Sequence, residues 1–194
     1  MKKFLWLLPL SIILYACPFE STVPLEPHPV EPVDSSLIGY WYGIVKDGSD
    51  FFGIEALDIT QKSDSTYAIT RYGKAVKGDI ILPDTAYFAG YISYIDSQRY
   101  MNIEGTVKIE MPPRKNKPRE YQYQKVYYLS TFETHHDTLS VRTITESFSP
   151  TRKNFRSPQE LKQLVVDLTN QKKNIYDDLY SLSYRKIAKP VKMF

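Results

Sequence analysis

Residues whose types could support chemistry are few in this chain. Histidines cluster only at His135 and His136, which Asp137 follows directly. Neighbouring residues of a strand point to opposite faces of a sheet, so two adjacent rings do not easily share one metal ion. A zinc site would also need further ligands from elsewhere in the chain. We therefore predict a turn or rim position for these residues, and no metal site.

Patterns that mark common catalytic sites are also missing from the sequence. No serine lies in a Gly-x-Ser-x-Gly elbow, and no glycine-rich phosphate loop occurs. Paired acids such as Glu55 and Asp58 are present, but carboxylates on exposed strand faces are common. We predict a protein that is not an enzyme, with no catalytic residues and no cofactor.

Cys17 is the only cysteine of the 194 residues, and it directly follows a short apolar segment. Lys2 and Lys3 precede an almost wholly apolar run over residues 4–16, which is the pattern of a secretory signal. The run is shorter than the about 20 apolar residues that span a bilayer. A single cysteine also excludes an internal disulfide and a thiolate metal cluster.

The end of the apolar run resembles the lipobox of bacterial lipoproteins. Leu14, Ala16 and Cys17 match its positions, whereas Tyr15 is bulkier than the residue usual there. The resemblance implies cleavage after residue 16 and a diacylglyceryl thioether plus an N-acyl chain on Cys17. Because two or more acyl chains hold a protein stably at a membrane, it implies lasting attachment to the envelope, most commonly the outer membrane of a diderm bacterium. An ordinary secretory signal with a chance cysteine, or a simple membrane anchor, remains the alternative.

The rest of the chain has the size and charge of one nearly neutral domain. Removal of residues 1–16 leaves 178 residues, enough for one sizeable core. The formal net charge of +3 falls to +1, because Lys2 and Lys3 belong to the signal. This balance does not support a nucleic-acid partner.

Residues 17–33 form a proline-rich segment between the signal and the body. They favour an extended, semi-rigid tether behind the lipidated Cys17, which separates the membrane from a domain at 34–194. The alternative is an irregular arm that docks on the body through Val23, Leu25 and Val30. The prolines of the segment are Pro18, Pro24, Pro27, Pro29 and Pro32.

The body has the sequence pattern of an antiparallel β protein with one helix. Segments rich in Tyr, Ile, Val and Thr alternate with short turn signals, including residues 73–74 and 77–79. Ser157-Pro158-Gln159-Glu160 is a capping box that begins a helix, with apolar residues at helical spacing behind it. Strands are predicted near 38–46, 53–62, 65–73, 85–95, 99–110, 121–134, 137–146 and 179–187.

Closure of about eight strands into an up-and-down barrel would remove their edges. Within 34–42, Gly39 and Trp41 resemble the first-strand motif of lipocalins and the wider calycin group. The resemblance implies a lipocalin-like barrel in which Trp41 plugs one end under a cation near the last strand. Arg185 or Lys186 would supply that cation, and we take Arg185 as the motif residue. Two features depart from the lipocalin pattern, because the Thr-Asp-Tyr turn motif is absent and the helix precedes the final strand. The sequence motif therefore covers about nine residues, and the rest of the resemblance is one of architecture.

Tyrosine is abundant, with 16 residues, and offers both an apolar face and a hydroxyl. Such rings could line a pocket for a small hydrophobic or amphipathic ligand, a lipid or a sugar. The alternative is that most of them serve as strand formers in the core and on the surface. The tyrosines predicted to bind ligand are Tyr87, Tyr91, Tyr123 and Tyr127.

Two function classes remain at this point. One is a membrane-anchored binding protein with a ligand in its barrel. The other is a non-enzymatic accessory subunit, with a filled barrel, that binds a protein partner in the envelope. A basic loop at 112–119 is interpreted either as a contact to lipid head groups or an acidic partner, or as a solvated hairpin tip.

Overall fold

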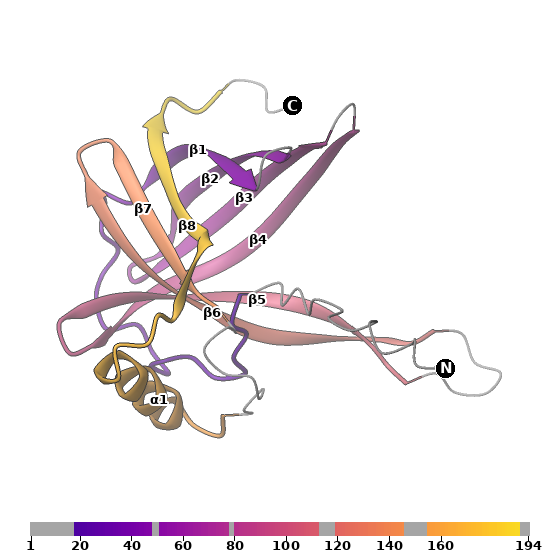
Figure 1. Cartoon of the computed structure of the whole chain (residues 1–194). Helices are drawn as coiled ribbons and strands as arrows, with labels where there is room; N and C mark the ends of the chain where they lie inside the picture. The colour runs from indigo at the N-terminus through magenta and orange to yellow at the C-terminus, as the bar shows by residue number, and fades with distance from the viewer. Residues whose placement is uncertain (1–17, 48–50, 78–79, 113–118, 146–154, 191–194) are drawn as a thin grey trace, which may run out of the picture.

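The computed structural model describes residues 18–47, 51–77, 80–112, 119–145 and 155–190 (Figure 1). Eight antiparallel strands form one closed barrel in chain order, and one helix precedes the last strand, which confirms the predicted fold class. The elements are β1 Gly39–Asp47, β2 Phe51–Ser63, β3 Thr66–Lys77, β4 Ile80–Ile95, β5 Gln98–Glu110, β6 Tyr121–His135, β7 Thr138–Ile144, α1 Pro158–Asn170 and β8 Tyr176–Ile187.

The β3–β4 hairpin is longer than the sequence indicated. Turns were predicted at residues 73–74 and 77–79, but β3 and β4 pair continuously from Tyr67↔Gly90 to Lys77↔Ile80. The prediction of a turn at 73–74 was wrong, because β-branched and apolar residues on both sides, such as Val76 and Ile81, favour the ladder over the turn propensity of one glycine.

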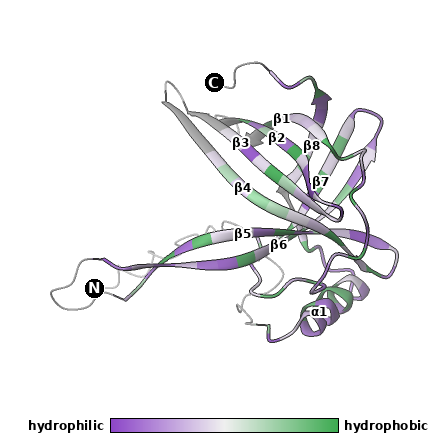
Figure 2. Cartoon of the chain, turned by 180° about the vertical axis from the view of Figure 1, so that it is seen from behind, coloured by the Kyte–Doolittle hydropathy of each residue, from purple (hydrophilic) through white to green (hydrophobic). Residues whose placement is uncertain are grey.

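The barrel wall is uneven between β4 and β5. Their ladder runs only from Ile95↔Gln98 to Ala89↔Glu104. Beyond this point β5 continues to pair with β6 as far as Glu110↔Tyr121. The two long hairpins therefore diverge, as Figures 1 and 2 show, and the barrel has one narrow end near Gly39 and one wide end.

Two sets of buried side chains lie on the two sides of the barrel wall. Cross-strand partners share a face of the sheet, so the register assigns each residue to the inside or the outside. The inner core contains Leu37, Trp41, Ile59, Tyr67, Ile69, Ile92, Met101, Phe132, Leu139 and Tyr184. The outer core contains Phe19, Leu25, Ile95, Tyr100, Leu129, Ile144, Phe155, Leu161, Val165, Leu168 and Ile175.

The proline-rich segment lies against the barrel over residues 18–33. The backbone N–H of Phe19 donates to the carbonyl of Ile144 at 2.9 Å. Leu25 is 1% exposed, and its N–H donates to Asn102 Oδ1 at 2.8 Å. These residues therefore dock on the barrel as an irregular arm, which is the second of the two predicted arrangements. The predicted extended tether was wrong for residues 18–33. Val30, however, stays 51% exposed.

Helix α1 begins at the predicted cap and covers the outer core. The N–H of Glu160 donates to Ser157 Oγ at 3.3 Å, and the Glu160 side chain accepts from the N–H of Arg156 at 2.9 Å. Leu161, Val165 and Leu168 are the buried residues of the helix. Among the described residues, no helix has the length and apolar character required to cross a bilayer.

Candidate functional site

Trp41 closes the narrow end of the barrel. Its side chain is 0% exposed, and its Nε1–H donates to the carbonyl of Leu37 at 2.9 Å. The ammonium of Lys186 lies 5.0 Å from the centre of the ring and donates to the carbonyl of Ser36 at 3.1 Å. The ring thus carries a cation over its face, which is a favourable electrostatic arrangement.

Gly39 gives the space that this arrangement needs. A Cβ at this position would lie 2.6 Å from Cε of Lys186, and the backbone has a φ of +143°. Both the close approach and the dihedral angle favour glycine. The short motif of Gly39 and Trp41 therefore has a local physical reason in this barrel.

The cation over Trp41 is Lys186 and not Arg185. Lys186 pairs with Trp41 across the β1–β8 ladder, so its neighbour Arg185 faces outward. Arg185 Nη1 lies 3.0 Å from Asp137 Oδ1 at the surface, and this bond from Arg185 lowers the pKa of Asp137. The choice of Arg185 as the motif residue was wrong, because adjacent strand residues alternate between faces.

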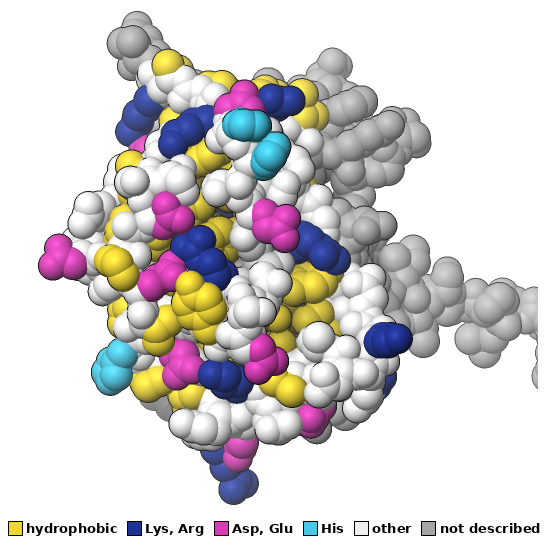
Figure 3. All heavy atoms as spheres, turned by 90° about the vertical axis from the view of Figure 1, so that its left-hand side faces the viewer, with side chains coloured by type: hydrophobic (Ala, Val, Ile, Leu, Met, Phe, Trp, Pro, Cys, Tyr) yellow, Lys and Arg dark blue, Asp and Glu magenta, His cyan; other side chains and the backbone are white. Residues whose placement is uncertain are grey.

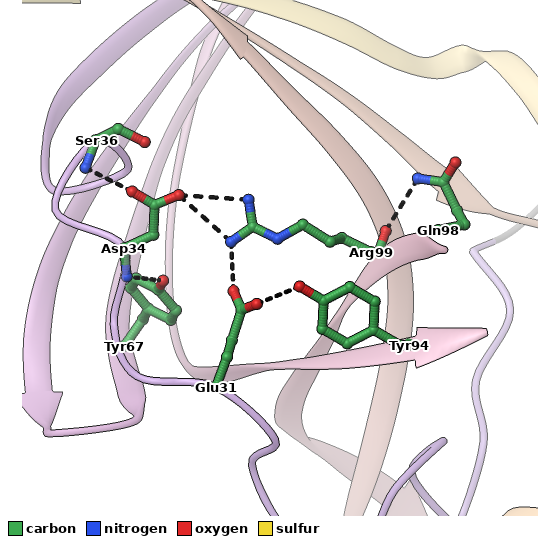
Figure 4. A network of polar contacts seen from close by, with 7 residues as sticks. All are labelled: Glu31, Asp34, Ser36, Tyr67, Tyr94, Gln98 and Arg99. Carbon is green, nitrogen blue, oxygen red and sulfur yellow. Dashed lines mark hydrogen bonds and ion pairs between the residues drawn. The ribbon is translucent and has the colours of Figure 1, made fainter. Parts of the chain in front are cut away.

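A network of charged and phenolic groups joins the arm to the same end of the barrel (Figure 4). Arg99 binds Glu31 and also lies 3.3 Å from Asp34 Oδ2. Tyr94 donates to Glu31, and Tyr67 accepts from the N–H of Asp34 at 2.7 Å. The arm is thereby fixed across the opening below Trp41.

The carboxyl group of Asp34 titrates below its ordinary range. Burial raises the pKa of Asp34, but hydrogen bonds from Ser36 and the charge of Arg99 outweigh burial and lower it overall. Arg99 also lies 4.9 Å from the ring centre of Phe132, an inner-core residue. The network therefore contacts the interior as well as the arm.

Above this sealed end, polar side chains enter the barrel interior. Arg71 is the cross-strand partner of Leu57, which in turn pairs with Trp41, so all three share the inner face. Arg71 Nη1 lies 3.9 Å from Glu55 Oε2. Tyr184 donates to the same carboxylate, and burial together with Glu55 raises the pKa of Tyr184 well above its ordinary value.

Tyr128 and Phe88 complete this part of the interior. Their rings meet edge to face with centroids 6.2 Å apart. The Tyr128 hydroxyl donates to Glu20 of the arm at 3.2 Å, and burial with the nearby Glu20 raises its pKa to about 12. We call Glu55, Arg71, Phe88, Tyr128 and Tyr184 the chamber cluster.

Water reaches the chamber cluster although its residues face inward. The side chain of Arg71 is 37% exposed and that of Glu55 is 16% exposed. By contrast, Trp41 and Tyr67 at the narrow end are both 0% exposed. The barrel is therefore filled at one end, whereas Arg71 and, to a lesser degree, Glu55 retain contact with solvent further along the interior.

All four tyrosines predicted to bind ligand face outward. Tyr87 and Tyr123 are 76% and 69% exposed. Tyr91 pairs with Asn102, contacts the arm and donates to the carbonyl of Glu26, and Tyr127 pairs with Glu104 on the same outer face. Their expected position on the inner face of the barrel was wrong by one residue of strand phase, which moves every side chain to the other face.

The alternation of residues in β3 is the local sequence signal for the interior residues. Tyr67, Ile69 and Arg71 alternate with Ala68, Thr70 and Tyr72, and the inner face is the set that includes Arg71. No local signal shows that Tyr128 and Tyr184 lie near Arg71, because they belong to strands distant in sequence.

The paired histidines lie at the β6–β7 turn, which confirms the predicted turn or rim position. Both are exposed, and their rings meet with centroids 4.3 Å apart. The expected separation onto opposite faces is wrong, because His136 has a φ of +52° and leaves the strand geometry. Among the described residues, no three His, Cys, Asp or Glu side chains are placed to hold a metal ion.

A cleft of about 640 Å³ lies outside the barrel, between the end of α1 and the outer face of β5–β7. Its walls include Tyr100, Thr131, Arg142 and Tyr176, with the Arg142 guanidinium 4.2 Å from the Tyr176 ring centre. No local pattern in the sequence indicates this cleft, because its walls come from distant segments.

Cys17 lies outside the described residues, so its lipidation stays a prediction. No model of a known protein family, no curated protein and no solved structure matches this chain. The resemblance to lipocalins and lipoproteins therefore rests on the sequence motifs alone.

Proposed function

We propose that this protein is an envelope lipoprotein, lipidated at Cys17 and held at the outer membrane, whose lipocalin-like barrel binds a small amphipathic ligand. The supporting observation is the chamber cluster. Its Arg71 faces the interior yet remains 37% exposed, above an end that Trp41 fills. A binding role requires only such an accessible, mixed polar and apolar interior, whereas catalysis would require further groups.

The charges of the chamber favour an uncharged polar head group on the ligand. Arg71 is a donor, whereas Glu55 and Glu20 are acceptors that already bind tyrosine hydroxyls. A head group that both donates and accepts would satisfy this mixture, whereas an anionic head would meet two carboxylates. Phe88 and the neighbouring ring of Tyr128 offer apolar surface to the ligand's body.

Calorimetric titration with octyl glucoside, below its micelle concentration, tests this proposal. We expect saturable binding that is stronger than binding of octanoate. Arg71→Met keeps an unbranched side chain, although a shorter one, and removes the guanidinium donors, so it should weaken octyl glucoside binding by about tenfold or more. Arg185→Met is the matched control on the outer face and should leave binding unchanged.

Several outcomes would contradict the proposal. These are no saturable binding of octyl glucoside, equal affinity for octanoate, or equal binding by the Arg71→Met variant and the wild type. Circular dichroism of each variant verifies the fold, so that a lost site is distinguished from an unfolded protein.

An accessory subunit is the second candidate, supported by large apolar side chains that remain on the surface. Ile44, Tyr87 and Tyr123 are 67%, 76% and 69% exposed. Exposed aromatic residues are typical of protein contacts. Purified protein without a bound lipid but with a stable envelope partner would favour this role over ligand binding.

A further inference from the structure

The end of the β5–β6 hairpin presents apolar and basic side chains away from the body of the barrel. We call the exposed residues Lys108, Ile109, Arg119, Tyr121 and Tyr123 the hairpin tip. Ile109, Tyr121 and Tyr123 are 39%, 45% and 69% exposed. Figures 1 and 2 show that this hairpin extends well beyond the other strands.

The tyrosines and cations of the tip lie close together. Tyr121 and Tyr123 are two residues apart in β6, and Tyr123 pairs directly with Lys108 of β5. The ammonium of Lys108 lies 3.7 Å from the ring centre of Tyr121. Arg119 is 75% exposed, and its contact with Glu110 at 3.4 Å is a surface ion pair that solvent weakens.

Positive charge is concentrated in this part of the chain. By sequence, residues 106–125 hold six Lys or Arg and two Glu, a formal charge of +4, whereas the whole chain carries +3. Lys108, Arg119 and Lys125 are the cations among the described residues, beside the exposed Glu110 and Glu120, and the other three cations lie at 114, 115 and 117, outside the described residues. The remainder is therefore close to neutral. On the barrel's narrow end, acidic, basic and hydrophobic side chains are instead interspersed (Figure 3).

We propose that the hairpin tip binds the surface of an anionic lipid bilayer. Tyrosine rings settle at the interface between head groups and acyl chains, since each has an apolar body and a polar hydroxyl. Lysine and arginine beside them are attracted to anionic head groups. This contact is separate from the acyl chains on Cys17 and from any ligand in the chamber, and it adds a second attachment that orients the barrel.

Sedimentation with lipid vesicles tests the proposal on a chain that begins at Pro18. This chain retains all eight strands, the helix and every residue named in the two cores, and circular dichroism verifies that it folds before the vesicles are added. We expect binding to vesicles of mixed phosphatidylglycerol and phosphatidylcholine, and much weaker binding to phosphatidylcholine alone. Added salt should reduce the binding.

Double replacement of Tyr121 and Tyr123 by serine should weaken vesicle binding about tenfold. Both rings are exposed, so the variant should fold normally. Tyr87→Ser is the matched control, because Tyr87 is 76% exposed on β4 outside the tip. Equal loss in the control, or no loss in the double variant, would overturn the proposal.

Tryptophan fluorescence shows which part of the protein contacts the lipid vesicles. Tyr123→Trp should show a blue shift with anionic vesicles and quenching by brominated lipid, whereas Tyr87→Trp should show neither. Unchanged emission of Tyr123→Trp would mean that the tip stays in water, and would instead favour a protein partner for these residues.

Discussion

At the scale of single residues, the narrow end of the barrel depends on three positions acting together. Gly39 leaves room for the Lys186 side chain, and Lys186 covers the ring of Trp41. Two of these residues are close in sequence, and the third lies in the last strand. The glycine is therefore required by a contact as well as by its backbone angle.

Gly39→Ala tests this dependence. The added methyl group clashes with Lys186, and an alanine backbone must adopt an unfavourable φ, so we expect a loss of about 1–3 kcal/mol in the free energy of unfolding. In a Lys186→Ala background the clash is removed, and the same substitution should cost less. Urea denaturation of the four proteins measures the coupling; equal costs in both backgrounds would show that the lysine is irrelevant to Gly39.

Asp34 makes part of the stability dependent on pH. Its pKa is lower in the folded protein than its ordinary value of 3.8, so its contribution is present above that value and is lost as the pH falls through the lower, folded one. Asp34→Asn should therefore destabilise the protein at pH 7, and the difference from wild type should shrink below about pH 4. Urea denaturation of both proteins between pH 7 and pH 3 measures this difference in the free energy of unfolding.

Glu133→Gln is the control for this experiment, because Glu133 is exposed on β6. This variant should differ little from wild type at any pH. A constant difference between Asp34→Asn and wild type from pH 7 to pH 3 would show that the effect of Asp34 is not electrostatic.

At the scale of elements, the arm is part of the folded domain. It contributes Phe19 and Leu25 to the outer core and Glu31 and Asp34 to the sealed end. Its prolines favour an extended backbone, and an extended chain can lie along a wall as easily as it can project from one. Buried apolar side chains explain why it lies along the wall.

Leu25→Ala should cost about 2–5 kcal/mol in the free energy of unfolding, because the side chain is 1% exposed. Val30→Ala is the control in the same arm, where the side chain is 51% exposed, and should stay within about 0.5 kcal/mol of wild type. Chemical denaturation measures the free energy of unfolding of both variants. Similar small effects at the two positions would indicate an arm that detaches in solution.

At the scale of the whole molecule, the barrel is asymmetric. One end is sealed by Trp41 and the arm, the middle holds the partly exposed Arg71, and the β5–β6 hairpin projects beyond the barrel. The docked arm begins at Pro18, which pairs with Thr145. A lipid on the preceding residue would therefore hold the barrel close to the bilayer, without a long spacer.

Cys17→Ala tests the anchor. The substitution should abolish metabolic labelling with palmitate and move the protein out of the membrane fraction, because no other cysteine is present to accept a thioether. Thr22→Ala, an exposed position of the arm, should retain both properties. Continued labelling of the Cys17→Ala protein would refute the lipobox interpretation.

The sequence by itself determined the elements of this protein. Residue preferences and turn signals predicted eight strands, although they made the β3–β4 hairpin too short, and Ser157 with Glu160 marked the start of the helix, because these signals are local. Closure into a barrel also followed, since it is the simplest way to remove unpaired strand edges.

Only the tertiary structure decided which side of each strand faces inward and which distant residues meet. Side chains of a strand alternate between the two faces of the sheet, but the sequence does not show which set faces inward. Tyr87 and Arg185 were therefore assigned to the wrong face. The position of Lys186 over Trp41, the docking of Leu25 and the gathering of the chamber cluster around Arg71 depend on contacts between distant strands. Such contacts arise from the packing of the whole chain, which no local pattern encodes.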